Sequence, residues 1–221
     1  MSRILASLFA LLACSFAFAE MPAADKALAV FFEREYQWTL LQSPEYATLL
    51  GDERYNDRLT DRSADAVASR KVHSLQALAE IEAFDPGRLN VQDRMSRAIF
   101  LDGARRDIAF DLIYGKLPLG AGPDNWLPVG TQSGPQVDLA QLAKAGPFRN
   151  ASDYENWLKR LDAVPRLLAQ VTSLLEAGIA SGWLPPREAV IRVPGQLAAC
   201  SPWEPVASAL FAPFLAFPER I

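Results

Sequence analysis

The stretch SDYENWLKRLDAVPRLLAQVTSLL, residues 152–175, decides the fold class of this chain. Its apolar side chains recur at steps of four or three residues, at Tyr154, Leu158, Leu161, Val164, Leu168, Val171 and Leu175. This spacing follows the 3.6-residue period of an amphipathic helix. Ser152 and Glu155 stand at capping-box spacing, so Ser152 is expected to cap the helix, and Gly182 to end it. Pro165 should kink the helix or divide it in two, because proline has no backbone N–H.

Helical periodicity covers most of the remaining chain. It predicts helices over residues 22–42, 44–51, 63–83, 90–115 and 137–145, and one from residue 185 that Pro194-Gly195 bends or interrupts. The inward-facing side chains of the first, third and fourth helices are expected to be Leu28, Phe31, Phe32, Trp38 and Leu41; Val72, Leu75, Leu78 and Ile81; and Met95, Ala98, Leu101, Ile108 and Leu112. Strand-like alternation never extends beyond a few residues. The predicted fold is all-α, an irregular multi-helix array with proline-broken helices and one long Gly/Pro-rich loop.

That loop, residues 116–136, contains eight glycine and proline residues and almost no charge. Glycines let a backbone approach a ligand closely, and long loops in compact domains often carry function. An ordered connector packed on helices is the alternative interpretation. The candidates for lining a substrate cleft are Gln132, Ser133, Gly134 and Gln136.

The first 19 residues have the pattern of a secretory signal. Arg3 precedes an apolar run over residues 4–13, and Ala17 and Ala19 match the small-x-small pattern that signal peptidase cleaves. The apolar run is shorter than the ~20 residues needed to span a bilayer, so it does not predict a transmembrane segment. We expect an exported protein, periplasmic or extracellular.

A lipoprotein is the alternative. Leu11-Leu12-Ala13-Cys14 resembles a bacterial lipobox, in which the acylated cysteine becomes the mature N-terminus and a lipid anchor. The residues from Ser15 to Phe18 stay apolar, whereas lipoproteins usually turn polar after the cysteine. This difference favours cleavage after Ala19.

We predict that the exported protein begins at Glu20, because the segment from Ala17 to Ala19 is the better processing site. Intact-mass measurement and N-terminal sequencing of material secreted by a bacterial host would check it. A mature chain that begins at an acylated Cys14 would contradict this prediction.

Composition argues against several classes of function. Arg3 is the one charged residue of the signal, so the mature chain has 21 basic and 26 acidic side chains and a net charge of −5. A nucleic-acid-binding protein usually has a basic face, so no nucleic-acid partner is expected. His73 and Cys200 are the single histidine and cysteine left, and no H-E-x-x-H motif or Cys/His cluster occurs. We therefore expect no metal or cofactor in this chain, and interpret His73 as an exposed or half-exposed helix residue.

Several segments, taken in order, resemble one protein family. They are SPEYATLLGD (43–52), RYNDRL (54–59), QSGPQ (132–136), YENWLKRL (154–161) and EAGIASGWLPPR (176–187). Together they resemble the N-terminal part of the domain-of-unknown-function 885 family, over essentially the whole mature chain. Members of that family are secreted or lipid-anchored, largely helical and similar to gluzincin-type zinc metallopeptidases.

The resemblance implies a larger parent protein. Residues 20–221 would be its helical N-terminal part, truncated at the C-terminal end. The H-E-x-x-x-G-H zinc motif and the third ligand of the family lie in the absent half, so no metal or catalytic residue transfers to this sequence. The apolar tail over residues 211–221 is accordingly expected to lack a packing partner.

Two functions follow as expectations. In the first, the chain is the non-catalytic N-terminal half of a secreted zinc-metallopeptidase-like protein and forms part of the cleft wall that receives a peptide substrate. In the second, it is a stand-alone helical periplasmic binding or interaction module without catalysis. In both, the chain alone is not an enzyme, whereas the full-length relative would be a zinc-dependent hydrolase.

Overall fold

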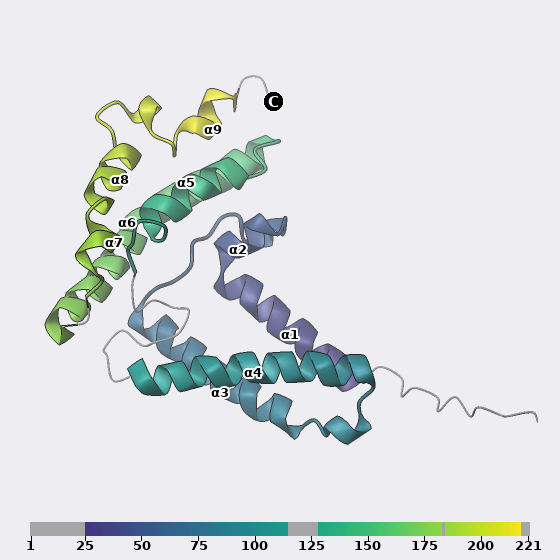
Figure 1. Ribbon diagram of the computed structural model, residues 1–221. Helices are drawn as coiled ribbons and strands as arrows, with labels where there is room; N and C mark the ends of the chain where they lie inside the picture. The colour runs from purple at the N-terminus through teal and green to yellow at the C-terminus, as the bar shows by residue number, and fades with distance from the viewer. Residues whose placement is uncertain (1–24, 115–127, 183, 218–221) are drawn as a thin grey trace, which may run out of the picture.

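The computed structural model describes residues 25–114, 128–182 and 184–217 (Figure 1). The signal residues Cys14, Ala17 and Ala19 lie outside this range, as does much of the Gly/Pro-rich loop. The described residues contain helices and turns and no β-strand, which confirms the all-α prediction.

The helices form two groups (Figure 1). The first group contains α1 (Lys26–Gln42), α3 (Ala64–Ala83) and α4 (Val91–Tyr114). The second contains α5 (Pro135–Ala145), α6 (Ala151–Ser181), α7 (Arg187–Val190), α8 (Val193–Cys200) and α9 (Ala212–Leu215). Between them lies α2 (Pro44–Leu49), and the short 3₁₀ helices are η1 (Glu53–Tyr55), η2 (Pro86–Arg88) and η3 (Pro205–Ala207). The break between α7 and α8 falls just before Pro194, as predicted.

The first group has its own hydrophobic core. Its buried side chains are Leu28, Phe31, Ala77, Ile81 and Leu89. The Phe31 ring makes edge-to-face contacts with the rings of Phe32, Phe84 and Phe100. These contacts join α1 to α4 and to the end of α3.

Helix α1 begins at Lys26, four residues later than the predicted start at Pro22. Asp25 has extended backbone and caps the helix, because its carboxylate accepts hydrogen bonds from the N–H groups of Ala27 and Leu28. Asn90 caps α4 as expected, since its Oδ1 accepts a 2.8 Å hydrogen bond from the N–H of Asp93.

Some predicted inward positions face solvent. Leu41 of α1, Val72 and Leu75 of α3, and Met95 and Ala98 of α4 are exposed. The side chains of α3 that are buried instead are Val67, Arg70, Ala77 and Ile81. Ile81 is buried as predicted, but the other buried positions, 67, 70 and 77, follow the same helical period with a different phase. The neighbouring helices determine which face of the helix is buried, and the period of the sequence alone does not determine it.

The cap of α6 is two residues earlier than predicted. Asn150, and not Ser152, caps the helix, since Asn150 Oδ1 accepts the N–H of Asp153 at 3.1 Å. In return, Asp153 Oδ2 accepts the N–H of Arg149 at 2.7 Å. Asp153 thus has the capping-box role that the sequence predicted for Glu155, and Ser152 is exposed.

The buried face of α6 is also rotated relative to the predicted stripe. Leu158 and Leu168 are exposed, whereas the buried residues are Asp153, Tyr154, Trp157, Arg160, Leu167, Val171, Leu174 and Gly178. Residues 157, 167 and 174 each precede a predicted position by one. The sequence has apolar residues at the predicted positions and at the positions just before them, so the apolar face of the helix is wider than one stripe. The packing of neighbouring elements determines which part of this face is buried most deeply.

Pro165 does not divide α6, which is continuous from Ala151 to Ser181. The proline is exposed, so its ring faces solvent while both halves of the helix pack against other elements. Gly182 ends the helix as predicted. Its φ of 74° is left-handed, and its N–H donates to the carbonyls of Gly178 and Ile179.

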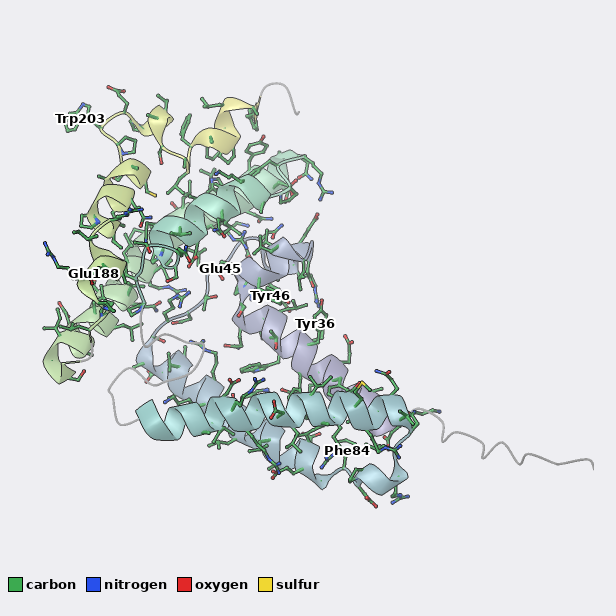
Figure 2. All side chains as sticks on the ribbon, viewed as in Figure 1. Tyr36, Glu45, Tyr46, Phe84, Glu188 and Trp203 are labelled. Carbon is green, nitrogen blue, oxygen red and sulfur yellow. The ribbon has the colours of Figure 1, made fainter. Side chains whose placement is uncertain are left out.

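The tail has packing partners within the chain. Leu210 and Phe214 pack against a second core, and Trp157 Nε1 donates a 3.0 Å hydrogen bond to the carbonyl of Leu210. The buried side chains of this second core are Leu59, Leu139, Leu142, Ala143, Phe148, Tyr154, Trp157, Leu167 and Val171. Within residues 211–221, the expectation of a missing partner is therefore wrong for Phe214, whereas Leu215 and Phe217 of the same tail are exposed. Trp203, in contrast, is 97% exposed and projects from the segment between α8 and α9 (Figure 2).

Arg160 connects α6 to α2 and the segment after it. Its side chain is 2% exposed, and its Nε donates to the carbonyl of Arg58 at 2.8 Å. Its terminal nitrogen donates to Thr48 Oγ1 at 2.6 Å and to the carbonyls of Pro44 and Tyr55, each at 3.2 Å. Burial lowers the pKa of Arg160 to about 10, so the guanidinium stays charged at neutral pH. Three of the segments that carry the family resemblance meet at this side chain.

Candidate functional site

A polar pocket of about 540 Å³ lies between α1, α3 and α4. This volume is within the range of small-molecule and peptide-side-chain sites. One wall comes from the C-terminal half of α1, another from the inward face of α3, and the third from the middle of α4. The segment that leads from η1 to α3 closes one end with Thr60 and Arg62.

His73 and Glu35 form a hydrogen-bonded pair in this pocket. His73 Nε2 lies 2.7 Å from Glu35 Oε2, so the imidazole N–H donates to the carboxylate. The His73 ring stacks on Trp38, with ring centroids 3.7 Å apart and planes 8° apart. The side chain of His73 is 22% exposed, which agrees with the half-exposed position predicted. Glu35 and Trp38 hold the ring on two sides.

Glu35 is buried because its charge is compensated. Arg34 donates to Glu35 Oε1 from Nε at 3.2 Å and from its terminal nitrogen at 3.0 Å. The same guanidinium binds Glu80 on α3, which lowers the pKa of Glu80 and raises that of Arg34. The Glu35 carboxylate therefore has partners on both oxygens.

Small residues create the space in the pocket. Gly103 and Ala104 of α4 and Ala77 of α3 line it, together with the ring of Phe100. A Cβ atom added to Gly103 would meet no atom within 4 Å outside its own helical backbone and chain neighbours. The wall at Gly103 is therefore open, and a larger side chain there would extend into open space.

The acidic and histidine side chains that line the pocket do not form a metal site. Among the described residues, no group of three or more His, Cys, Asp or Glu side chains could hold a metal ion. The part of the chain that the structure describes thus contains no ligand set for the zinc that the family resemblance implies. No step of a metal-dependent reaction is assigned to these residues.

The predicted cleft residues lie elsewhere, at the start of α5. Gln132 and Ser133 are exposed, and Gly134 is buried with a φ of 111°. A Cβ on Gly134 would come within 3.0 Å of the carbonyl oxygen of Pro128, so this backbone requires glycine. None of the four predicted residues lines the pocket between α1, α3 and α4.

Gln136 has a structural contact network. It is buried, and its Nε2 donates to the carbonyl of Gly130 at 2.8 Å and to that of Ser133 at 3.2 Å. Its own carbonyl accepts a hydrogen bond from the Cys200 thiol at 3.3 Å, and burial raises the pKa of that thiol. These bonds hold the loop onto α5 and α8. A role for the four residues in a substrate cleft stays a prediction.

Sequence reasoning missed the pocket because it treated His73 as an isolated residue. The sequence feature that indicates the pocket is the spacing of the polar residues on α3. Arg70, His73 and Ser74 stand at helical intervals between Val67 and Ala77, so polar side chains occupy part of a stripe that is apolar at both ends. A polar interruption of a buried stripe indicates either a buried network or a site.

Among the helices of the described residues, none is both long and apolar enough to cross a membrane. The model of the family described as "Bacterial protein of unknown function (DUF885)" matches residues 44–220. Searches of curated proteins and of solved structures returned no match. The matched range begins after α1, so the pocket combines the matched helices α3 and α4 with a helix that precedes them. The match covers most of the sequence and agrees with the segments quoted above, and the chain therefore belongs to the DUF885 family of bacterial proteins.

Proposed function

We propose that this chain is the peptide-binding helical part of an exported, zinc-metallopeptidase-like protein, and that the pocket between α1, α3 and α4 is a portion of its substrate-cleft wall. The observation that carries the proposal is the pocket itself. It combines a polar pair, His73 and Glu35, with the aromatic side chains of Trp38 and Phe100. A peptide offers amides to the polar groups and side chains to the aromatic ones.

In this proposal the chain binds substrate and does not catalyse its cleavage. The zinc, its ligands and the general base would come from the C-terminal half that the resemblance implies. The protein would act outside the cytoplasm, released after cleavage at Ala19 or tethered through Cys14. Reading the gene downstream of codon 221 for an H-E-x-x-x-G-H segment tests this division of roles.

A stand-alone binding module is the second candidate. The observation that favours it is the second core, which the chain closes with its own Leu210 and Phe214. A gene that ends at codon 221, without a zinc motif downstream, would favour this module over the peptidase half. The pocket would have the same binding role in either case.

We predict that Gly103→Leu weakens peptide binding at least tenfold, because leucine would occupy the open space in front of Gly103. The fold should persist, since replacing a helical glycine with leucine favours the helix by up to about 1 kcal/mol. Isothermal titration of residues 20–221 with a mixture of N-acetylated dipeptide amides and acids, followed by single peptides, measures the effect.

Gly195→Leu is the matched control. Gly195 is also a helical glycine with no atom within 4 Å of an added Cβ, but it lies on α8, away from the pocket. Binding by this variant should equal that of the unmodified chain. Equal weakening by both variants, or no peptide binding by the unmodified chain, would overturn the proposed function.

A further inference from the structure

One end of the pocket holds three hydrogen-bond donors that have no acceptor among the described residues. The Arg62 guanidinium makes no hydrogen bond or ion pair there, although the backbone N–H of Arg62 donates to Gln170. Gln42 accepts a hydrogen bond from Arg70 through its Oε1, but its amide nitrogen donates to no described group. Ser43 starts α2 without a side-chain cap bond. All three residues line the pocket.

Glu35, Glu45 and Asp138 do not satisfy these donors. Glu35 is occupied by Arg34 and His73, and Glu45 accepts the N–H and hydroxyl of Thr60 at 3.0 and 2.5 Å. Burial raises the pKa of Asp138 on α5, and the nearby positive charge of Arg62 partly opposes this rise. Asp138 and Arg62 nevertheless do not form an ion pair.

Carbon surfaces line the pocket around Phe100, and Asp107 of α4 is also among the lining residues. Ala77, Phe100 and Ala104 present carbon surfaces there. A ligand that fills the pocket would therefore have an anionic group at the Arg62 end and an apolar group near Phe100. A planar guanidinium with adjacent amide and hydroxyl donors is suited to the two oxygens of a carboxylate.

We propose that Arg62, Gln42 and Ser43 form a carboxylate-binding end of the pocket, and that this end selects peptides with a free carboxylate beside an apolar side chain. The inference rests on the proposed function, namely that the pocket binds peptides. To that function it adds the chemical group of the peptide that is recognised, a carboxylate, and the residues that bind this group. The carboxylate can be the C-terminus of the peptide or an acidic side chain, which share the same chemistry.

Three probes separate these sources: N-acetyl-Ala-Leu with a free C-terminus, the same peptide as its amide, and N-acetyl-Glu-Leu amide. Titration calorimetry should find the free acid bound roughly 10- to 100-fold more tightly than the amide, as expected for a hydrogen bond to a charged group. Equal gains for the first and third probes would assign recognition to carboxylates in general. A gain for the first alone would assign it to the C-terminus.

Arg62→Gln should remove the preference for the acid and leave the affinity for the amide unchanged. Arg187→Gln is the control, since Arg187 is an exposed arginine on α7 outside the pocket. If Arg62→Gln loses both ligands by unfolding, Ser43→Ala is the second test, with an expected three- to tenfold loss for the acid alone. Its hydroxyl has no bond to lose within the described residues.

The possible failures are distinct. Binding of acid and amide with equal affinity, both blocked by Gly103→Leu, would overturn the carboxylate inference and leave the proposed function standing. A preference for the acid that persists in both Arg62→Gln and Ser43→Ala would also overturn it. No binding of any probe would overturn the inference together with the proposed function.

Discussion

Replacing Arg160 with methionine is expected to lower the free energy of unfolding by about 3 kcal/mol. Methionine fills much of the volume but donates nothing, so the Pro44 carbonyl and the Thr48 hydroxyl, both in buried contacts with Arg160, would lose this donor. Removing the buried charge recovers part of its desolvation cost, which keeps the expected loss below the sum of the hydrogen bonds. Urea denaturation monitored by circular dichroism measures the change.

Lys159→Met is the matched control for Arg160. Lys159 is the preceding residue of α6, is exposed, and donates a hydrogen bond to Asn156 Oδ1 at 3.3 Å. Its replacement should alter the free energy of unfolding by no more than about 0.5 kcal/mol. Equal stability of the Arg160 and Lys159 variants would show that the connection between α6 and α2 does not depend on the arginine.

Truncating Phe31 to alanine is expected to cost about 3–5 kcal/mol, the usual range for removing a buried ring. Phe31 is 1% exposed and contacts three other aromatic rings across α1, α4 and the end of α3. The cavity would lie beside Phe100, which also lines the pocket. Weaker peptide binding should therefore accompany the loss of stability.

Val30→Ala tests whether burial is the cause. Val30 precedes Phe31 on α1 but is 67% exposed, and alanine is the better helix former. Its variant should be as stable as the unmodified chain or slightly more so. A comparable loss of stability in both variants would mean that α1 is sensitive to any truncation, and not to the loss of the Phe31 ring.

These two side chains show how far the sequence could predict the core. Phe31 falls on a regular apolar stripe, so its burial follows from local periodicity. Arg160 falls on the same face of α6 as Trp157 and Val171, yet no sequence pattern predicts that a charged residue will be buried there. Its partners come from residues more than 100 positions earlier, and only the packing of α6 against α2 brings them within reach.

The candidate site shows the same division. Glu35, Trp38 and His73 are ordinary residues in sequence, on two helices separated by more than twenty positions. They form a site because α1 and α3 pack with these faces together. The Gly/Pro-rich loop had a stronger sequence signal, but at Gly134 and Gln136 that signal reports a tight turn and a buried amide network.

By itself, the sequence determined that the chain is helical, approximately where most helices begin and end, and which family it belongs to. Periodicity, caps, glycines and prolines act over a few residues, so their effects can be read locally. The tertiary structure decided that Asn150 caps α6 in place of Ser152, which phase of each apolar stripe is buried, and where the polar pocket lies. These outcomes depend on the free energy of contacts between distant segments, and a helix with a wide apolar face is compatible with several of them until its neighbours pack against it.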